Sequence, residues 1–216
     1  MADLLCKVVG NDPEKLHRMT VYPSPSSTAK PAPLVYSGVN AVIIDSMAWL
    51  FRITGTARYQ QFCLACLQEW QLPHSPDFLR QTLKGVHYYQ LSAGGPRWEC
   101  LHTVMSLAEL AWSTGNQEYA TALRDIWWDL AERERKPQGA IMSQEGAQGS
   151  VYKSGSQETC CVVAWSALSV KMLCLTGDSL VADELELSLF NSAMMFTQPS
   201  GAWITYDSQV STGSLF

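Results

Sequence analysis

Charged side chains are scarce in this chain of 216 residues. Asp, Glu, Lys and Arg make up 16% of the sequence, where about a quarter is usual for a soluble domain, and the net charge is −5. Basic residues form no cluster of the kind that follows a phosphate backbone, which argues against a nucleic-acid partner. The eight Trp and eight Met residues instead predict broad apolar surfaces, buried inside the protein or against a partner.

Features of export and membrane insertion are also lacking. The stretch Met1-Ala-Asp-Leu-Leu-Cys-Lys7 has neither the charged nor the apolar region of a signal peptide, and no uncharged apolar run reaches the ~20 residues that span a bilayer. The seven cysteines are odd in number and follow no small-domain disulfide spacing. We therefore expect free thiols, a cytoplasmic location and no membrane partner. A larger secreted parent that has lost its leader is the alternative.

The chain is expected to form a single domain in three stretches. Residues 1–37 are an N-terminal segment and a loop, in which the four prolines between Tyr22 and Pro33 forbid a helix and favour extended chain. A surface loop is the simpler interpretation of this stretch, and a lid over a pocket is the alternative. Residues 38–196 are a helical array, and residues 197–216 are a C-terminal strand and tail.

A Thr-Gly pair recurs three times along the helical array. The segments Met47–Tyr59, Leu107–Tyr119 and Ser169–Val181 align without gaps, and their glycines lie 60 and 62 residues apart. A helical apolar pattern precedes each glycine and another follows it. We therefore expect Gly55, Gly115 and Gly177 to end a first helix in the left-handed conformation, and the next residue (Thr56, Asn116 or Asp178) to cap a second.

Each unit is therefore predicted to be an αα-hairpin, and a fixed long period indicates hairpins stacked on one core. The predicted fold class is all-α, part of an α/α-barrel or toroid, with a short β segment at Gly201–Tyr206. A ring of six such hairpins would need about 360 residues, so we expect an open arc, a fragment, or one half of an assembly that closes through self-association into a homodimer. The expected helices are 39–54, 57–71, 76–91, 98–114, 117–135, 158–175 and 179–196.

A carboxylate and a thiol lie two residues apart where a polar loop meets an apolar helical pattern. Glu158 and Cys160 are ligand types that zinc accepts, which makes a zinc site one interpretation. A capping Glu beside two buried cysteines is the alternative. Cys161 is expected to point away from Cys160, because successive helical residues differ by about 100°.

The same region resembles glycoside hydrolase family 127, the β-L-arabinofuranosidase family. The resemblance is firm from Gly155 to Tyr206 and weaker over Tyr36 to Tyr119. It rests on Ser156-Gln-Glu-Thr-Cys160, Trp165, Leu175-Thr-Gly-Asp178, Ala182-Asp-Glu-Leu-Glu186 and Asn191. It implies an α/α-barrel followed by β-sandwich domains, and hydrolysis of a glycoside with retention.

The resemblance also implies roles for individual residues. Glu158 and Cys160 would bind zinc, and two further adjacent cysteines, one of them the nucleophile, would lie beyond the point where this chain ends. Cys160 and Cys161 are not that pair, since Cys160 already belongs to the first motif. The general acid/base would be Glu145, the only carboxylate between Gly139 and Gly155; a solvent-facing loop Glu is the alternative. Without the nucleophile region we expect the chain alone to be weakly active or inactive.

Other reactive or aromatic residues receive weaker predictions. Trp98, His87, Tyr88 and Trp165 are candidates for the wall of a sugar-binding cavity, because aromatic faces stack on sugars, or for core packing. Cys100 or His102 could serve as substitute zinc ligands. Cys63 and Cys66 form a CxxC motif within a helical pattern, which favours core packing over a redox pair.

Two functional hypotheses thus remain from the sequence. One is a glycoside hydrolase-like partial barrel with a carbohydrate ligand. The other is a non-catalytic helical module that binds a carbohydrate or a protein and self-associates.

Overall fold

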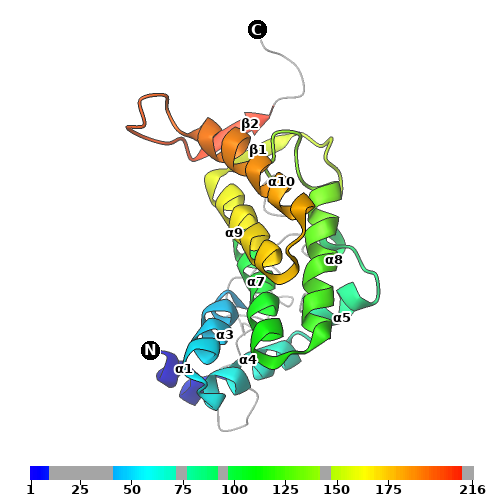
Figure 1. The fold of residues 1–216 in the computed structure, drawn as a ribbon, viewed down its shortest axis with the longest axis vertical. Coiled ribbons are helices and arrows are strands. Elements are labelled where there is room, and N and C mark those ends of the chain that lie inside the picture. Colours follow the sequence, from blue (N-terminus) through cyan, green and yellow to red (C-terminus); the bar gives the residue numbers. More distant parts are fainter. Residues whose placement is uncertain (10–40, 72–76, 92–96, 142–146, 211–216) are drawn as a thin grey trace, which may run out of the picture.

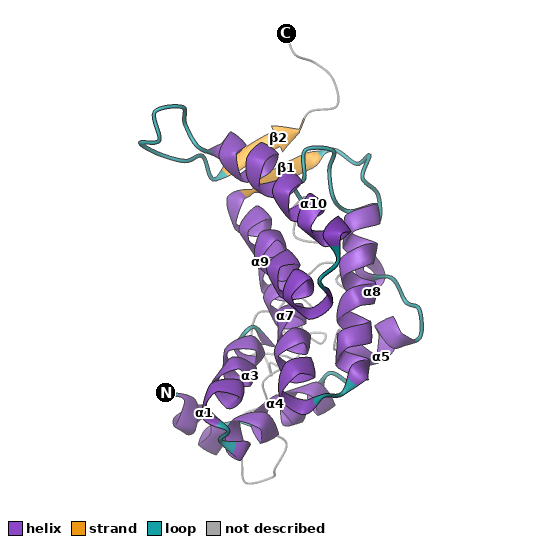
Figure 2. Ribbon diagram, viewed as in Figure 1, coloured by secondary structure: helices purple, strands orange, loops and turns teal. Residues whose placement is uncertain are grey.

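The computed structural model describes residues 1–9, 41–71, 77–91, 97–141 and 147–210, without the side chains of residues 97 and 208–210. The proline-rich stretch, its lid alternative and Glu145 lie outside these residues. Among them the chain is mainly helical, with a short pair of strands (Figure 2). The helices are α1 Ala2–Val8, α3 Ile43–Thr54, α4 Ala57–Glu69, α5 Phe78–Leu83, α6 Tyr88–Leu91, α7 Arg97–Thr114, α8 Gln117–Arg133, α9 Thr159–Thr176 and α10 Ser179–Leu187. The strands are β1 Gly155–Glu158 and β2 Asp207–Val210, and a π-helical turn η1 Ser188–Ala193 and a 3-10 turn η2 Met194–Phe196 follow α10.

The helices form an array of αα-hairpins. The first helices of three hairpins, α3, α7 and α9, pack together with α7 in the middle, and each packs against its own second helix, α4, α8 or α10 (Figure 1). The short helix α5 packs against α8. The all-α prediction of stacked hairpins that form part of an α/α-barrel is confirmed. The division into three stretches remains a prediction.

The three Thr-Gly turns share one hydrogen-bond pattern. Each glycine has a left-handed φ, of 66°, 71° and 66° in chain order. The hydroxyl of the preceding Thr donates to the carbonyl four residues back at 2.5–2.8 Å and accepts from the N–H two residues ahead at 3.2 Å. One Thr side chain thereby satisfies polar groups of both helices, at Thr54, Thr114 and Thr176.

The predicted caps of the second helices are confirmed in two hairpins of three. The Asn116 side chain accepts from the Glu118 N–H and that of Asp178 from the Leu180 N–H, both at 2.9 Å. Thr56 makes no such side-chain hydrogen bond at the start of α4.

Most buried apolar side chains of the described residues form one large cluster, to which α3, α4, α7, α8 and α9 all contribute. Trp127 of α8 stacks on Trp165 of α9 with ring centroids 5.2 Å apart, and both side chains are fully buried. Their indole N–H groups donate to the hydroxyls of Ser169 and Ser188, each at 3.0 Å. Both aromatic rings are therefore buried without the cost of an unpaired polar group.

The CxxC motif agrees with its prediction from the sequence. Cys63 and Cys66 are buried, and burial raises the pKa of the Cys63 thiol to about 12, so the CxxC motif packs the core. Helix α9 is long and apolar enough, by length and composition, to cross a membrane, but it packs here against α7, α8 and α10.

The expected helix 76–91 was wrong, because the chain forms two short helices there. Asp129 of α8 accepts a hydrogen bond from the Tyr88 N–H at 2.6 Å, and Asp77 caps α5 by accepting from the Arg80 N–H at 3.3 Å. A carboxylate far along the chain thus starts the second helix, and the local pattern gave no indication of it.

The C-terminal predictions were displaced by several residues. The expected strand 201–206 is a turn in which Ile204 bridges Thr197, whereas β2 begins at Asp207 and pairs antiparallel with β1. The helix expected to reach residue 196 widens into the π-helical turn η1 at Ser188, where Gly139 meets its backbone. Contacts between residues far apart in the sequence therefore set both the start of β2 and the end of the regular helix.

Candidate metal centre

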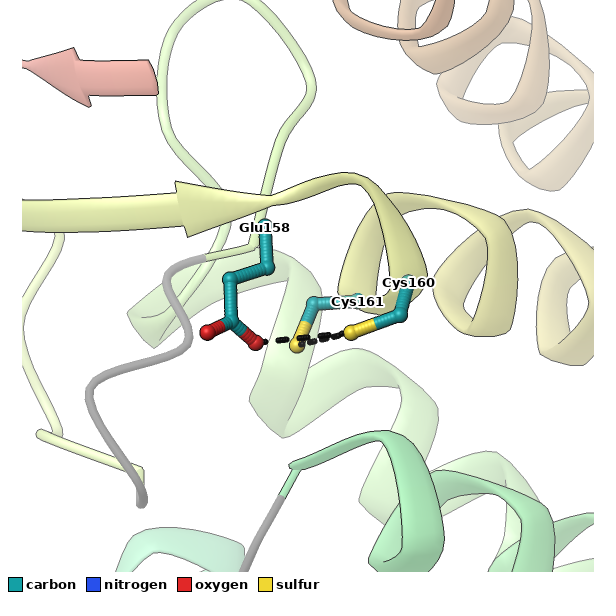
Figure 3. Close-up of side chains that lie close together, drawn as sticks. All are labelled: Glu158, Cys160 and Cys161. Carbon is teal, nitrogen blue, oxygen red and sulfur yellow. Dashed lines mark hydrogen bonds between the residues drawn. The ribbon is translucent and has the colours of Figure 1, made fainter. Parts of the chain in front are cut away.

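Three ligand-bearing side chains converge where β1 meets α9. Glu158 ends the strand, and Cys160 and Cys161 lie in the first turn of the helix (Figure 3). The Cys160 thiol donates to Glu158 Oε2 at 3.4 Å, and the two sulfur atoms lie 3.9 Å apart. All three groups offer a ligand atom within 4.8 Å of the others. The structure thus brings together the predicted pair, Glu158 and Cys160.

The expected direction of Cys161 was wrong. Both thiols face the same carboxylate, although the residues are adjacent on a helix (Figure 3). Helical side chains tilt toward the N-terminus, and in a first turn no preceding turn separates them. Two short side chains can therefore converge on a point beyond the helix end.

The strand pair holds this helix terminus in place. Glu158 of β1 pairs with Asp207 of β2, and the Thr159 N–H donates to the Tyr206 carbonyl at 2.8 Å. The Tyr206 hydroxyl in turn donates to the Cys160 sulfur at 3.1 Å. Sequence analysis missed this contact, because nothing in the local pattern pairs residues so far apart.

Glu158 and Tyr206 shift the pKa of the Cys160 thiol in opposite directions. Burial is the main cause that raises the pKa of Cys160, the Glu158 carboxylate raises it further, and the Tyr206 hydrogen bond lowers it. The same hydrogen bond is the main cause that raises the pKa of Tyr206. Burial and Glu158 together thus favour the neutral form of the Cys160 thiol.

The donor set fits zinc. Thiolates and a carboxylate are accepted zinc ligands, and soft sulfur donors select against magnesium and calcium. Among the described residues neither Cys100 nor His102 joins the group. Cys100 is buried in the core, and burial lowers the pKa of His102, whose ring lies 4.3 Å from that of Trp98.

The segment that follows the candidate acid Glu145 is tied to the end of α8. Glu134 is buried and accepts from the N–H groups of Gln148 and Gly149, at 2.6–3.1 Å. The Lys136 ammonium, also buried, donates to the carbonyls of Val151 and Lys153. Two buried charges therefore fix the chain between residue 147 and β1. The sequence gave no sign of their role.

The four wall candidates differ in exposure. Trp165 is buried in the core and offers no surface to a ligand in this structure. Tyr88 is also buried, but it is among the residues that line the same pocket as His87. Trp98 is half-buried. His87 is half-exposed, with Nδ1 at 2.7 Å from Asp129 Oδ1, and lines a pocket of about 310 Å³ between α5, α6 and α8.

A family of known proteins matches most of this chain. The family description "Beta-L-arabinofuranosidase, GH127 catalytic domain" matches residues 28–214. No curated protein matches the chain.

Solved structures of the same family share the fold. A β-arabinofuranosidase of family 127 superposes with a TM-score of 0.67 at 20% identity, over 95% of this chain and 30% of that one. A β-L-arabinofuranosidase from Geobacillus stearothermophilus T6 gives 0.66 at 16% identity, over 95% and 33%. A further glycoside hydrolase gives 0.65 at 16% identity, over 88% and 35%. The chain thus spans about a third of each relative's length, and it belongs to glycoside hydrolase family 127.

Proposed function

We propose that this glycoside hydrolase-like chain contributes a metal centre and a general acid/base to the retaining hydrolysis of β-L-arabinofuranosides. The observation that carries the proposal is the convergence of Glu158 and Cys160 at the start of α9. The family match over residues 28–214 supports the reaction class. A carbohydrate ligand, self-association and a cytoplasmic location belong to the same proposal.

The residues divide the work as follows. Glu158 and Cys160 hold zinc, which supplies Lewis-acid character and keeps a thiol deprotonated at neutral pH. Glu145 protonates the leaving oxygen, a role that suits a carboxylic acid kept neutral by an apolar pocket. Glu134 and Lys136 hold the segment between residue 147 and β1, which follows Glu145 in the chain. Retention requires a nucleophile as well, so we expect this chain alone to be weakly active or inactive.

The test combines metal content with hydrolysis. Protein purified without chelator should contain about one zinc per chain, and Cys160→Ser should lose it because a hydroxyl is a poor zinc ligand. Cys174→Ser is the matched control, since this exposed thiol lies on the same helix. Any release of the phenol from an aryl β-L-arabinofuranoside should fall about 10²-fold or more in Glu145→Gln. Zinc-free wild-type protein, or hydrolysis unchanged in Glu145→Gln, would contradict the proposal.

A second function, sugar binding without catalysis, is favoured by the pocket between α5, α6 and α8. Its volume of about 310 Å³ is at the lower end for small-ligand sites. Trp128 lines it beside Asp129, which is held by His87 and by Arg133 Nε at 2.8 Å. The Thr82 hydroxyl, 6% exposed as a residue, has no hydrogen-bond partner among the described residues. An aromatic face with charged groups and a spare hydroxyl suits a sugar.

Calorimetric titration with arabinose and short arabinan fragments tests this function. We expect Trp128→Ala to weaken binding about tenfold, because it removes the stacking face. Trp203→Ala is the control, since Trp203 is 54% exposed and does not line the pocket. Binding should not change when a chelator is present. Equal affinity of both variants, or no binding by the wild type, would exclude the pocket.

A further inference from the structure

The pocket between α5, α6 and α8 carries more negative than positive charge. Its lining includes the carboxylates of Asp125, Asp129 and Glu132. The cationic groups that line it are the guanidinium of Arg133 and, when protonated, the imidazole of His87. Carboxylates therefore outnumber cations in either state of the imidazole. A hollow lined by an excess of one charge attracts ligands of the opposite charge, so this pocket favours a cation.

The three carboxylates follow one face of α8, and an aromatic ring lies among them. Residues 125, 129 and 132 are spaced four and three apart, which places them along the same side of a helix, where like charges repel each other. Trp128, which is half-buried, belongs to the same stripe and also lines the pocket. An indole face beside carboxylates attracts an ammonium group both through the ring and through the charges.

The carboxylates differ in how far the protein itself neutralises them. Asp129 Oδ1 lies 2.7 Å from His87 Nδ1 and accepts from Arg133 Nε at 2.8 Å, so this group is fully engaged. Asp125 makes only an exposed contact of 3.6 Å with the adjacent arginine. Glu132 is exposed and has no cationic partner among the described residues. The charge that remains for a ligand therefore lies at the two ends of the stripe.

A buried hydroxyl on α5 lines the same pocket. Thr82 is 6% exposed, and its Oγ1 has no hydrogen-bond partner among the described residues. A helical Thr can donate to the carbonyl four residues back, as the Thr of each Thr-Gly turn does in this chain. Thr82 makes no such bond, and a buried polar group without a partner destabilises the fold. A ligand with its own hydroxyl groups would supply the missing hydrogen bond.

We propose that this pocket binds an amino sugar, a sugar ring that carries an ammonium group. The inference rests on the second function proposed above and names the chemical class of its ligand. The ring lies against Trp128, a sugar hydroxyl pairs with Thr82, and the ammonium group faces the carboxylates of Asp125 and Glu132. The cavity of about 310 Å³ accommodates a monosaccharide.

Calorimetric titration with galactosamine and galactose tests the role of charge, since an ammonium group in the first replaces one hydroxyl of the second. We expect galactosamine to bind about tenfold more tightly at low ionic strength, because it adds ionic and cation–π attraction. The preference should shrink to about threefold in roughly 0.5 M NaCl, which screens exposed charges. Ethanolamine, which has the ammonium group without the ring, should bind more weakly than galactosamine.

Two variants separate the charge from the hydroxyl. Glu132→Gln should weaken galactosamine about threefold and leave galactose unchanged. Glu186→Gln is the matched control, since Glu186 is also an exposed helical carboxylate and does not line the pocket. Thr82→Val should weaken both sugars about fivefold, yet unfold at the same or a higher urea concentration, because it removes an unpaired buried hydroxyl.

The possible results distinguish this inference from the second function. Equal affinity for galactosamine and galactose, or a preference that Glu132→Gln leaves intact, would overturn the amino-sugar inference and leave a neutral-sugar site. Ethanolamine that binds as tightly as galactosamine would also overturn it, since the ring would then contribute nothing. A wild type that binds neither sugar would overturn both.

Discussion

Replacement of Lys171 by methionine is expected to lower the free energy of unfolding by about 3–5 kcal/mol, the usual cost of leaving a buried charge without its partner. The Lys171 ammonium lies 2.5 Å from Asp45 Oδ1 and 3.1 Å from Glu109 Oε1, and its side chain is 19% exposed. Arg52 binds the other Glu109 oxygen at 2.6 Å. Methionine fills similar space but leaves two carboxylates with one remaining cation.

The loss of stability in Lys171→Met should depend on pH. Burial raises the pKa of Asp45 above its usual range, and the nearby Lys171 opposes this shift. Between the unfolded and folded pKa values the native state binds more protons, so stability falls as pH rises through that window. Without Lys171 the pKa of Asp45 should rise further, because the cation that lowers it is gone. The deficit of Lys171→Met should therefore be larger at pH 7 than at an acidic pH, where Asp45 is protonated.

Urea unfolding followed by circular dichroism at both pH values measures this effect. Arg124→Met is the control, because Arg124 and Asp125 form an exposed pair at 3.6 Å that should contribute less than about 1 kcal/mol. If the two variants lost equal stability at pH 7, the ionic cluster would be no more than a surface contact.

Gly139→Ala is expected to cost about 3 kcal/mol or more. A Cβ atom at this position would lie 2.7 Å from Ser188 Cα and 2.8 Å from its nitrogen, and both atoms belong to a backbone that cannot swing aside. The φ of 90° adds strain for any residue with a side chain. Overpacking typically costs about 1–3 kcal/mol and a left-handed conformation about 1–2 kcal/mol.

Gly177→Ala separates the cost of overpacking from the cost of the left-handed backbone conformation. Gly177 has a similar left-handed φ of 66°, but nothing lies within 4 Å of the position that an alanine methyl group would take there, so only the strain of about 1–2 kcal/mol should remain. Trp fluorescence during urea unfolding is a suitable probe, because Ser188 also accepts the indole N–H of Trp165. Equal losses in the two variants would show that the close approach at Ser188 relaxes freely.

The hairpins could be predicted because their determinants are local. A Thr, a Gly and a capping residue lie within a few positions, and Thr54, Thr114 and Thr176 make the same bonds in each turn. The apolar spacing on either side then fixes which faces are buried. The predicted helix boundaries were wrong where a residue far along the chain sets them. Asp129 does so at Tyr88, and Gly139 does so at Ser188.

The candidate site was predictable in part for the same reason. Glu158 and Cys160 stood out because their spacing is local and carries a family resemblance. Cys161 was misplaced because an ideal helix angle says little about side chains in a first turn. Tyr206 and the buried Glu134 were not predicted, since their roles depend on chain segments brought together only by the fold. Glu145 stays a prediction.

The ion pair between Lys171 and Asp45 has a consequence for how the molecule unfolds. In an open stack each hairpin touches only its neighbours, and such arrays fray from their ends in steps. Here a side chain of α9 reaches across α7 to α3, so the first and third hairpins are joined directly. Loss of either outer hairpin would expose the shared charges of the others. We therefore expect one cooperative transition, with amide protons of α3, α7 and α9 exchanging together.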